Sequence, residues 1–127
     1  MHELSLMNGG FNVMATNCDD HTKNFSFILK QDSQWELSPA YDICFSYDPD
    51  NAWVSQHSLS MNSKHQAISQ DDLMIIARSN NIKRADKIIE EIKETVCNWT
   101  LYASRAKVSA ELTDMISDSL AALKFKG

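Results

Sequence analysis

NCDDHTKNFS, at residues 17–26, brings carboxylate, amide, imidazole and ammonium groups together in one short polar loop. This polar loop follows a largely apolar segment at residues 4–15 and precedes a segment with alternating apolar residues at 25–37. Asp and Asn are also common in ordinary turns, because they cap helices and tolerate left-handed backbone. Taken alone, Asp19 and Asn24 therefore predict only a turn, and the flanking segments decide whether the loop carries chemistry.

The segment before the polar loop predicts a buried helix. Apolar side chains occur at more than half of the positions from Leu4 to Ala15, which fits an enclosed helix better than an amphipathic one. Gly9-Gly10 weakens this prediction, because two glycines inside a helix cost about 2 kcal/mol relative to alanines. Either packing holds the helix together, or it is frayed before Phe11.

The segment after the polar loop predicts a β-hairpin. Phe25, Phe27 and Leu29 alternate with polar residues, a turn follows at residues 31–33, and alternation resumes at 35–37. Ser38-Pro39 ends the hairpin, since proline cannot donate to a strand ladder and restricts the residue before it. Tyr41-Asp42 then lies just past a strand end.

The remainder of the chain predicts a polar loop followed by helices. Residues 46–67 are rich in Ser, Asn, Asp and His and predict a long, partly extended loop, with a solvated turn at Lys64 and His65. We expect three helices: one from a Ser69–Asp72 capping box to Arg78, one over residues 84–106 with Trp99 in its core stripe, and one capped by Ser109. The last should bury Leu112, Ile116, Leu120 and Leu123, with Lys124 and Lys126 at its C-terminal end.

The order of polar loop, hairpin and acidic residue is that of a protein kinase. Protein kinases have a catalytic Asp on a loop after a helix, an Asn five residues later, a short hairpin, and then a metal-binding Asp. Asp19 and Asn24 have that five-residue spacing, and Asp42 follows a hairpin of suitable length. A carboxylate can accept the proton of an acceptor hydroxyl, and Asn and Asp oxygens suit Mg²⁺.

Two blocks resemble the signature of the HipA family of serine/threonine kinase toxins: residues 19–26, DDHTKNFS, and residues 37–42, LSPAYD. The resemblance implies one domain over residues 1–127, the HipA-like C-terminal domain. Its class would be α+β and mostly helical, forming the C-terminal, helical part of a protein-kinase-like fold with a small β-hairpin after the catalytic loop.

The same resemblance implies roles for five residues. Asp19 would be the catalytic base, and Asn24 and Asp42 would hold Mg²⁺. His21 and Lys23 would contact the phosphates of ATP beside Asn24 and assist catalysis.

The resemblance also implies partners. HipA-type toxins pair with a helix-turn-helix antitoxin and phosphorylate proteins such as aminoacyl-tRNA synthetases. The family's nucleotide-gripping lobe has no counterpart here, since the first eighteen residues contain no lysine and Gly9-Gly10 is not a GxGxxG loop. We therefore expect the isolated chain to be inactive until a complementary N-terminal lobe is supplied. The alternatives are a non-catalytic remnant that binds proteins and a truncated gene or fragment; apolar surface left open would favour homo-oligomers.

Composition excludes several other classes. The net charge of −5 and pI near 5.2 argue against direct nucleic-acid binding, and no apolar stretch is long enough to span a membrane. With no secretory signal, we expect a cytoplasmic protein with reduced thiols. Cys18 and His21 have a Cx2H spacing, but Cys44 and His57 lie thirteen residues apart, which argues against a structural zinc site.

Overall fold

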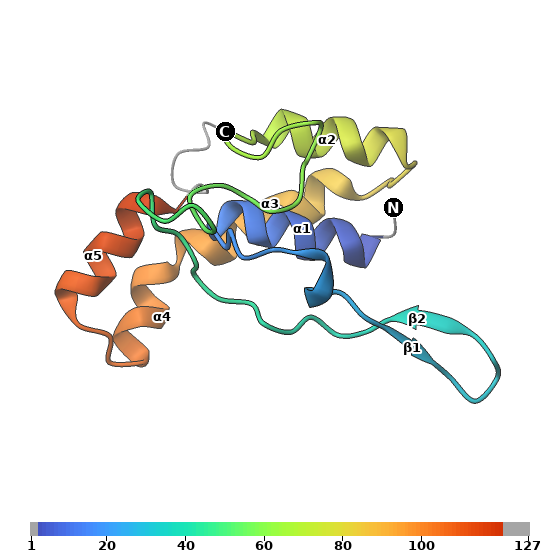
Figure 1. Cartoon of the computed structure of the whole chain (residues 1–127), viewed down its shortest axis with the longest axis horizontal. Helices are drawn as coiled ribbons and strands as arrows, with labels where there is room; N and C mark the ends of the chain where they lie inside the picture. The colour runs from blue at the N-terminus through green and yellow to red at the C-terminus, as the bar shows by residue number, and fades with distance from the viewer. Residues whose placement is uncertain (1–2, 121–127) are drawn as a thin grey trace.

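The structure is a computed structural model that describes residues 3–120. The elements in chain order are α1 (Glu3–Met14), the 3-10 turn η1 (Thr22–Asn24), β1 (Phe27–Leu29), β2 (Trp35–Leu37), α2 (Gln70–Ser79), α3 (Ala85–Cys97), α4 (Trp99–Arg105) and α5 (Ala110–Ser119). Figure 1 shows a helical body from which the antiparallel hairpin β1–β2 projects. The expected α+β, mostly helical class with one hairpin is confirmed. No helix in the described part of the chain is long and apolar enough to cross a membrane.

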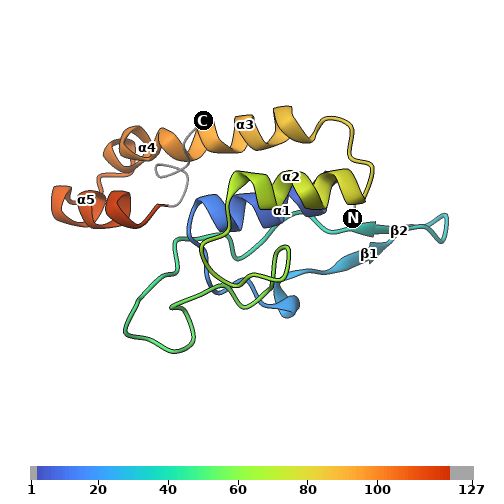
Figure 2. The same cartoon turned by 90° about the horizontal axis from the view of Figure 1, so that it is seen from above.

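The core lies where α1 packs along α3, with α2 beside both helices. Its fully buried side chains include Leu6, Met14, Leu73 and Ile89. Figure 2 shows the hairpin and the long loop at residues 46–67 on the side of α1 opposite α3. Helix α1 is therefore covered on both sides, and its buried residues include the polar Asn12 as well as Leu6, Val13 and Met14.

Gly9 and Gly10 lie inside α1, which runs through both without interruption. A Cβ added at Gly9 would collide with Cε of Met61, and a Cβ added at Gly10 would lie 3.3 Å from Cδ1 of Ile92. The glycines therefore let the long loop and α3 approach the helix closely. Of the two alternatives from the sequence, packing against neighbours is confirmed and fraying is wrong.

The helix predicted over residues 84–106 is in fact two helices, α3 and α4, which meet at Asn98. Asn98 has φ −84° and ψ 14°, and its amide is shared between the carbonyls of Glu94 and Thr95. The redirected α4 lets Nε1 of Trp99 donate to the carbonyl of Thr113 on α5, at 3.1 Å. A tertiary hydrogen bond thus accompanies a break that helical periodicity did not predict.

The two predicted helix caps are present. Ser69 and Asp72 form the capping box of α2, and Ser109 accepts from the amide of Leu112 at the start of α5. The stripe predicted for α5 is only partly right: Ile116 and Leu120 are buried, but Leu112 is exposed because it lies in the first turn, beyond the core. Leu123, Lys124 and Lys126 lie outside the described residues.

The turn at Lys64 is not simply solvated, which corrects the prediction. Nζ of Lys64 lies 2.9 Å from Oδ2 of buried Asp72, and Nδ2 of Asn62 donates to Oδ1 of the same carboxylate at 2.8 Å. The backbone amide of Ser69, followed by these side-chain donors, holds the pKa of Asp72 well below its usual range. The long loop is therefore tied to the first turn of α2.

Candidate functional site

The polar loop begins where α1 ends in a Schellman motif. The amide of Asn17 donates to the carbonyl of Asn12 at 2.8 Å, and that of Thr16 to the carbonyl of Val13 at 3.3 Å. Thr16 occupies the left-handed position usually taken by glycine, with φ 55°. Its hydroxyl donates to the carbonyl of Ser119 at the end of α5, at 2.7 Å. The C-terminal helix thereby fixes the direction in which the loop leaves α1.

Asn24 closes the polar loop on itself. Its Nδ2 donates to the backbone carbonyl of Asp19 at 2.8 Å, across the 3-10 turn η1. Because the amide nitrogen is used in this way, the carbonyl oxygen Oδ1 is the atom of Asn24 that suits a cation. The five-residue spacing seen in the sequence therefore corresponds to a hydrogen bond between the two residues.

Asp19 and its neighbour Asp20 have different environments. Asp19 is half-exposed, and Nε2 of His21 lies 3.6 Å from its Oδ1. Asp20 is buried: its Oδ1 accepts from the amide of Ser58 at 2.7 Å, and its Oδ2 lies 3.0 Å from Nδ1 of buried His57. Asp19 is thus accessible to a substrate, whereas Asp20 fastens the polar loop to the long loop.

Tyr41 fixes the position of Asp42 relative to the polar loop. Its hydroxyl donates to the carbonyl of Lys23 at 2.8 Å and shares a 2.7 Å hydrogen bond with the hydroxyl of Ser26. Asp42 itself has a left-handed φ of 55°, and its carbonyl accepts from Nδ2 of Asn17 at 3.4 Å. The end of the hairpin is therefore attached to the loop at both η1 and Asn17.

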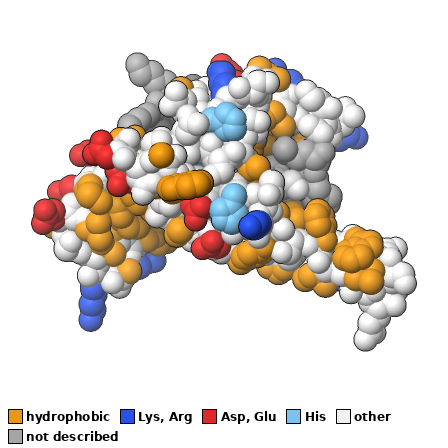
Figure 3. All heavy atoms as spheres, in the orientation of Figure 1, with side chains coloured by type: hydrophobic (Ala, Val, Ile, Leu, Met, Phe, Trp, Pro, Cys, Tyr) orange, Lys and Arg blue, Asp and Glu red, His pale blue; other side chains and the backbone are white. Residues whose placement is uncertain are grey.

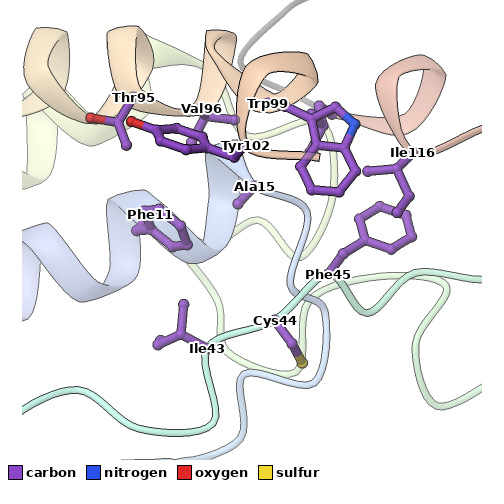
Figure 4. A pocket seen from close by; sticks show the side chains of 11 residues that line it. Phe11, Ala15, Ile43, Cys44, Phe45, Thr95, Val96, Trp99, Tyr102 and Ile116 are labelled. Atoms are coloured by element: carbon purple, nitrogen blue, oxygen red, sulfur yellow. The ribbon is translucent and has the colours of Figure 1, made fainter. Parts of the chain in front are cut away.

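The chain after Asp42 is anchored in the helical body. Ile43, Cys44 and Phe45 line an apolar cavity of about 180 Å³ together with side chains of α1, α3, α4 and α5. Figure 4 shows Phe45 pointing toward Trp99 and Ile116, while Phe11 of α1 lies on the other side of the cavity, near Ile43. One residue further, Ser46 accepts from the amide of Cys18 at 2.8 Å. These contacts hold residues 43–46 alongside the start of the polar loop.

The structure brings the predicted metal ligands together. Asn24 and Asp42 line the same small cavity, between the polar loop and the end of the hairpin. Burial, and then the charges of Asp42 and Asp19, raise the pKa of the Cys44 thiol. Both carboxylates therefore act on one thiol and create a locally negative region that favours a cation. The donor set, one amide oxygen and one carboxylate, fits a hard cation such as Mg²⁺.

The remaining predicted residues lie at the edge of this site. Lys23 is exposed on η1, and His21 immediately precedes that turn beside Asp19. In Figure 3, histidine and acidic side chains gather near the centre of the visible face, between the hairpin and the helical body. The geometry is compatible with phosphate contacts by both residues, which stay predictions.

The Cys and His residues considered for zinc do not form a cluster. Within residues 3–120, no group of three or more His, Cys, Asp or Glu side chains is arranged to hold a metal ion. Burial, with a smaller contribution from Asp20, raises the pKa of Cys18 to about 11, so the thiol stays protonated near neutral pH. Nδ1 of His57 is already paired with the carboxylate of Asp20.

Sequence reasoning missed three polar contacts of the site. Asp20–His57 and Asn12–Asn17 are buried side-chain pairs, and the hydroxyl of Tyr41 donates to the backbone carbonyl of Lys23 at the surface. The tandem Asp19-Asp20 was a usable signal, because two adjacent carboxylates seldom share one role. Nothing in the sequence pattern pointed to His57 as the partner.

The fold and the site together define an α+β domain with an acidic, amide-rich loop closed against a hairpin. The chain matches the family model described as the HipA-like C-terminal domain over residues 6–100, more than half of its length. It therefore belongs to the HipA-like C-terminal domain family. The match includes the polar loop, the hairpin and Asp42. No curated protein and no solved structure matches the chain.

Proposed function

We propose that this chain is the catalytic C-terminal part of a HipA-like protein serine/threonine kinase of the toxin–antitoxin type. The observation that carries the proposal is the closed polar loop: Asn24 holds the backbone of Asp19 and lines one cavity with Asp42. Membership of the HipA-like family supports the same function. ATP would be the phosphoryl donor and a protein hydroxyl the acceptor.

In this mechanism the half-exposed carboxylate of Asp19 orients an acceptor Ser or Thr hydroxyl and takes its proton. The hydroxyl oxygen forms a bond to the terminal phosphorus of ATP as the bond from that phosphorus to ADP breaks, and ADP leaves. Oδ1 of Asn24 and the carboxylate of Asp42 would hold Mg²⁺, which would neutralise charge on the phosphates when bound. His21 and Lys23 contact the phosphates from the edge of the site. Asp20 keeps the loop in position through Ser58 and His57.

The complete enzyme also needs a lobe that grips ATP. We propose that this lobe comes from another chain or from the rest of a longer polypeptide, and that the present chain is inactive without it. A helix-turn-helix antitoxin and a protein substrate such as an aminoacyl-tRNA synthetase are the expected partners, and the cytoplasm is the expected compartment. All of these follow from the family and are proposals for this chain.

A second candidate, a protein-binding module without chemistry, is favoured by the hairpin. Phe27, Leu29 and Trp35 lie on one face of the ribbon, and each is at least half-exposed. Figure 3 shows apolar side chains along the projecting hairpin. A two-stranded hairpin is only marginally stable alone, so an apolar partner surface would stabilise it. Either the nucleotide-gripping lobe or an antitoxin could provide that surface.

The decisive test of catalysis is Asp19→Asn in the kinase assembled with its nucleotide-binding lobe. Removing the base should lower phosphoryl transfer from radiolabelled ATP to protein by about 10²-fold to 10⁴-fold, without changing the circular dichroism spectrum. Asp86→Asn, on the exposed start of α3, is the matched control and should retain full activity. Unchanged transfer in the Asp19 variant would contradict the assigned base.

Binding can be tested on the chain itself by calorimetric titration with Mg²⁺-ATP, with Asp42→Ala as the comparison. Binding that requires Asp42 would support a preformed half-site. Absence of binding would favour a site that is completed only by the second lobe, or the binding-module alternative. Stoichiometric association with a partner but no phosphoryl transfer would identify the chain as a binding module.

A further inference from the structure

A pair of deeply buried asparagines lies beneath the candidate site. Asn12 is 3% exposed and Asn17 is 1% exposed. Nδ2 of Asn17 donates to Oδ1 of Asn12 at 2.9 Å and to the backbone carbonyl of Asp42 at 3.4 Å. Both hydrogens of this amide are therefore used, one on α1 and one on the segment that carries a proposed metal ligand.

The carbonyl oxygen of the same amide is not used. Within residues 3–120, Oδ1 of Asn17 is buried and has no hydrogen-bond partner. A buried acceptor left unsatisfied is destabilising, so such a group needs an explanation. Asn17 is one of the residues that line the small cavity also lined by Asn24 and Asp42, so a molecule bound there lies beside this amide.

The chemistry of the cavity indicates what its partner is. An amide carbonyl can only accept, so the partner must be a donor or a cation. Asp42 is an acidic residue of the cavity lining, and Asn8 and Asn12 are further amide residues of that lining. Mg²⁺ keeps several of its waters when it binds proteins, and those waters are strong donors. The cavity, of about 10 Å³, has room for about one water molecule, so a water carried by a divalent cation can satisfy the oxygen while the cation itself meets the carboxylate.

We propose that Oδ1 of Asn17 accepts a hydrogen bond from a water molecule on the divalent cation held by Asn24 and Asp42. Asn17 is then a positioning residue, because it acts on the cation through water and on Asp42 through the Asp42 carbonyl. This inference rests on the proposed metal site. Hydrogen-bonding partners of this kind typically change metal affinity by about 10-fold to 100-fold when removed.

The test is Mn²⁺ binding to the full chain, measured by electron paramagnetic resonance of free Mn²⁺, together with the Mn²⁺-dependent rise in melting temperature. Asn17→Ala removes both the acceptor and the donor, and should weaken Mn²⁺ binding about 10-fold or more. Asn17→Asp keeps an acceptor oxygen but loses the donor, and should bind at least as tightly as the unaltered chain. Asn8→Asp adds the same charge elsewhere on the cavity wall and should bind less tightly than Asn17→Asp.

These variants separate the outcomes. Equal weakening by Asn17→Ala and Asn17→Asp would mean that only the donated hydrogen bonds matter, and would overturn the inference. Wild-type binding by Asn17→Ala with loss in Asp42→Ala would overturn the inference and leave the proposed metal site standing. No Mn²⁺ binding by the unaltered chain would overturn both. Each shift in melting temperature is taken against the metal-free form of the same variant, so a folding defect is not read as lost binding.

Discussion

Asp19 and Asp20 are chemically identical neighbours, yet only the carboxylate of Asp19 is accessible to solvent. Asp20 accepts from the amide of Ser58 and pairs with His57, both on the long loop, while Asp19 is half-exposed beside His21. The difference comes from which segment covers each carboxylate. A role can therefore be assigned to one residue of the pair only after the long loop has been located.

At the same scale, Asp72 should contribute pH-dependent stability. Its pKa is held below the ordinary value, chiefly by the amide of Ser69, so its stabilising contribution is complete above the unfolded pKa of about 3.9 and declines as pH falls toward the folded value. Asp72→Asn should lower the free energy of unfolding at neutral pH by about 2–3 kcal/mol and flatten its decline below about pH 4. Urea unfolding across this pH range measures both effects.

Asp71→Asn is the control for the Asp72 variant. Asp71 lies in the same first helical turn but is exposed, so only its favourable interaction with the helix dipole is lost, costing less than about 1 kcal/mol. Equal losses in the two variants would show that the capping network adds nothing beyond the dipole.

At the scale of elements, the contact between α4 and α5 depends on Trp99. Its Nε1 donates to the carbonyl of Thr113, while its ring lines the cavity that anchors the chain after Asp42. Trp99→Phe keeps most of the apolar surface and removes the hydrogen bond, so we expect a loss of about 1–2 kcal/mol in the free energy of unfolding.

Trp53→Phe provides the matched comparison for Trp99→Phe, because Trp53 is 85% exposed. Its stability in urea should equal that of the unaltered chain within about 0.5 kcal/mol. If the two variants lose the same stability, the tertiary role given to the indole of Trp99 is wrong.

Elements also show how periodicity can mislead. Ile88, Ile89 and Ile92 of α3 follow helical periodicity and are buried. The same pattern extended smoothly through Asn98, where the backbone changes direction. Periodicity reports which residues face the core, but it does not register a bend that keeps the same residues inside.

At the scale of the whole molecule, the projecting hairpin exposes several large apolar side chains. Replacing Phe27 and Trp35 by Thr keeps β-propensity and removes exposed aromatic surface. If the chain self-associates through this face, the double variant should weaken association about tenfold or more, without lowering the melting temperature of the helical body. Sedimentation velocity at several concentrations measures the change.

Ile75→Ala tests whether the hairpin effect is specific. Ile75 is an exposed apolar residue on α2, far from the hairpin in sequence. Association unaffected by the hairpin double variant, or affected equally by Ile75→Ala, would argue against the hairpin as the contact surface.

The sequence by itself determined the features that depend on residues close together in the chain. These are the capping box of Ser69 and Asp72, the alternation of the hairpin, the apolar stripe of α3 and the spacing of Asp19 and Asn24. Each of these features depends on hydrogen bonds or side-chain directions between residues a few positions apart. The pattern can therefore be recognised in the sequence before the tertiary structure is known. The resemblance to the HipA family rests on the same short blocks.

Only the tertiary structure decided which side chains of these patterns are buried and with which partners. Gly9 and Gly10 are tolerated because Met61 and Ile92 occupy the space beside them. Asn24 and Asp42 meet in one cavity because Asn17 and Tyr41 fasten the two segments together. Burial and desolvation depend on segments far apart in the chain that come into contact only on folding, and local sequence patterns do not encode those pairings.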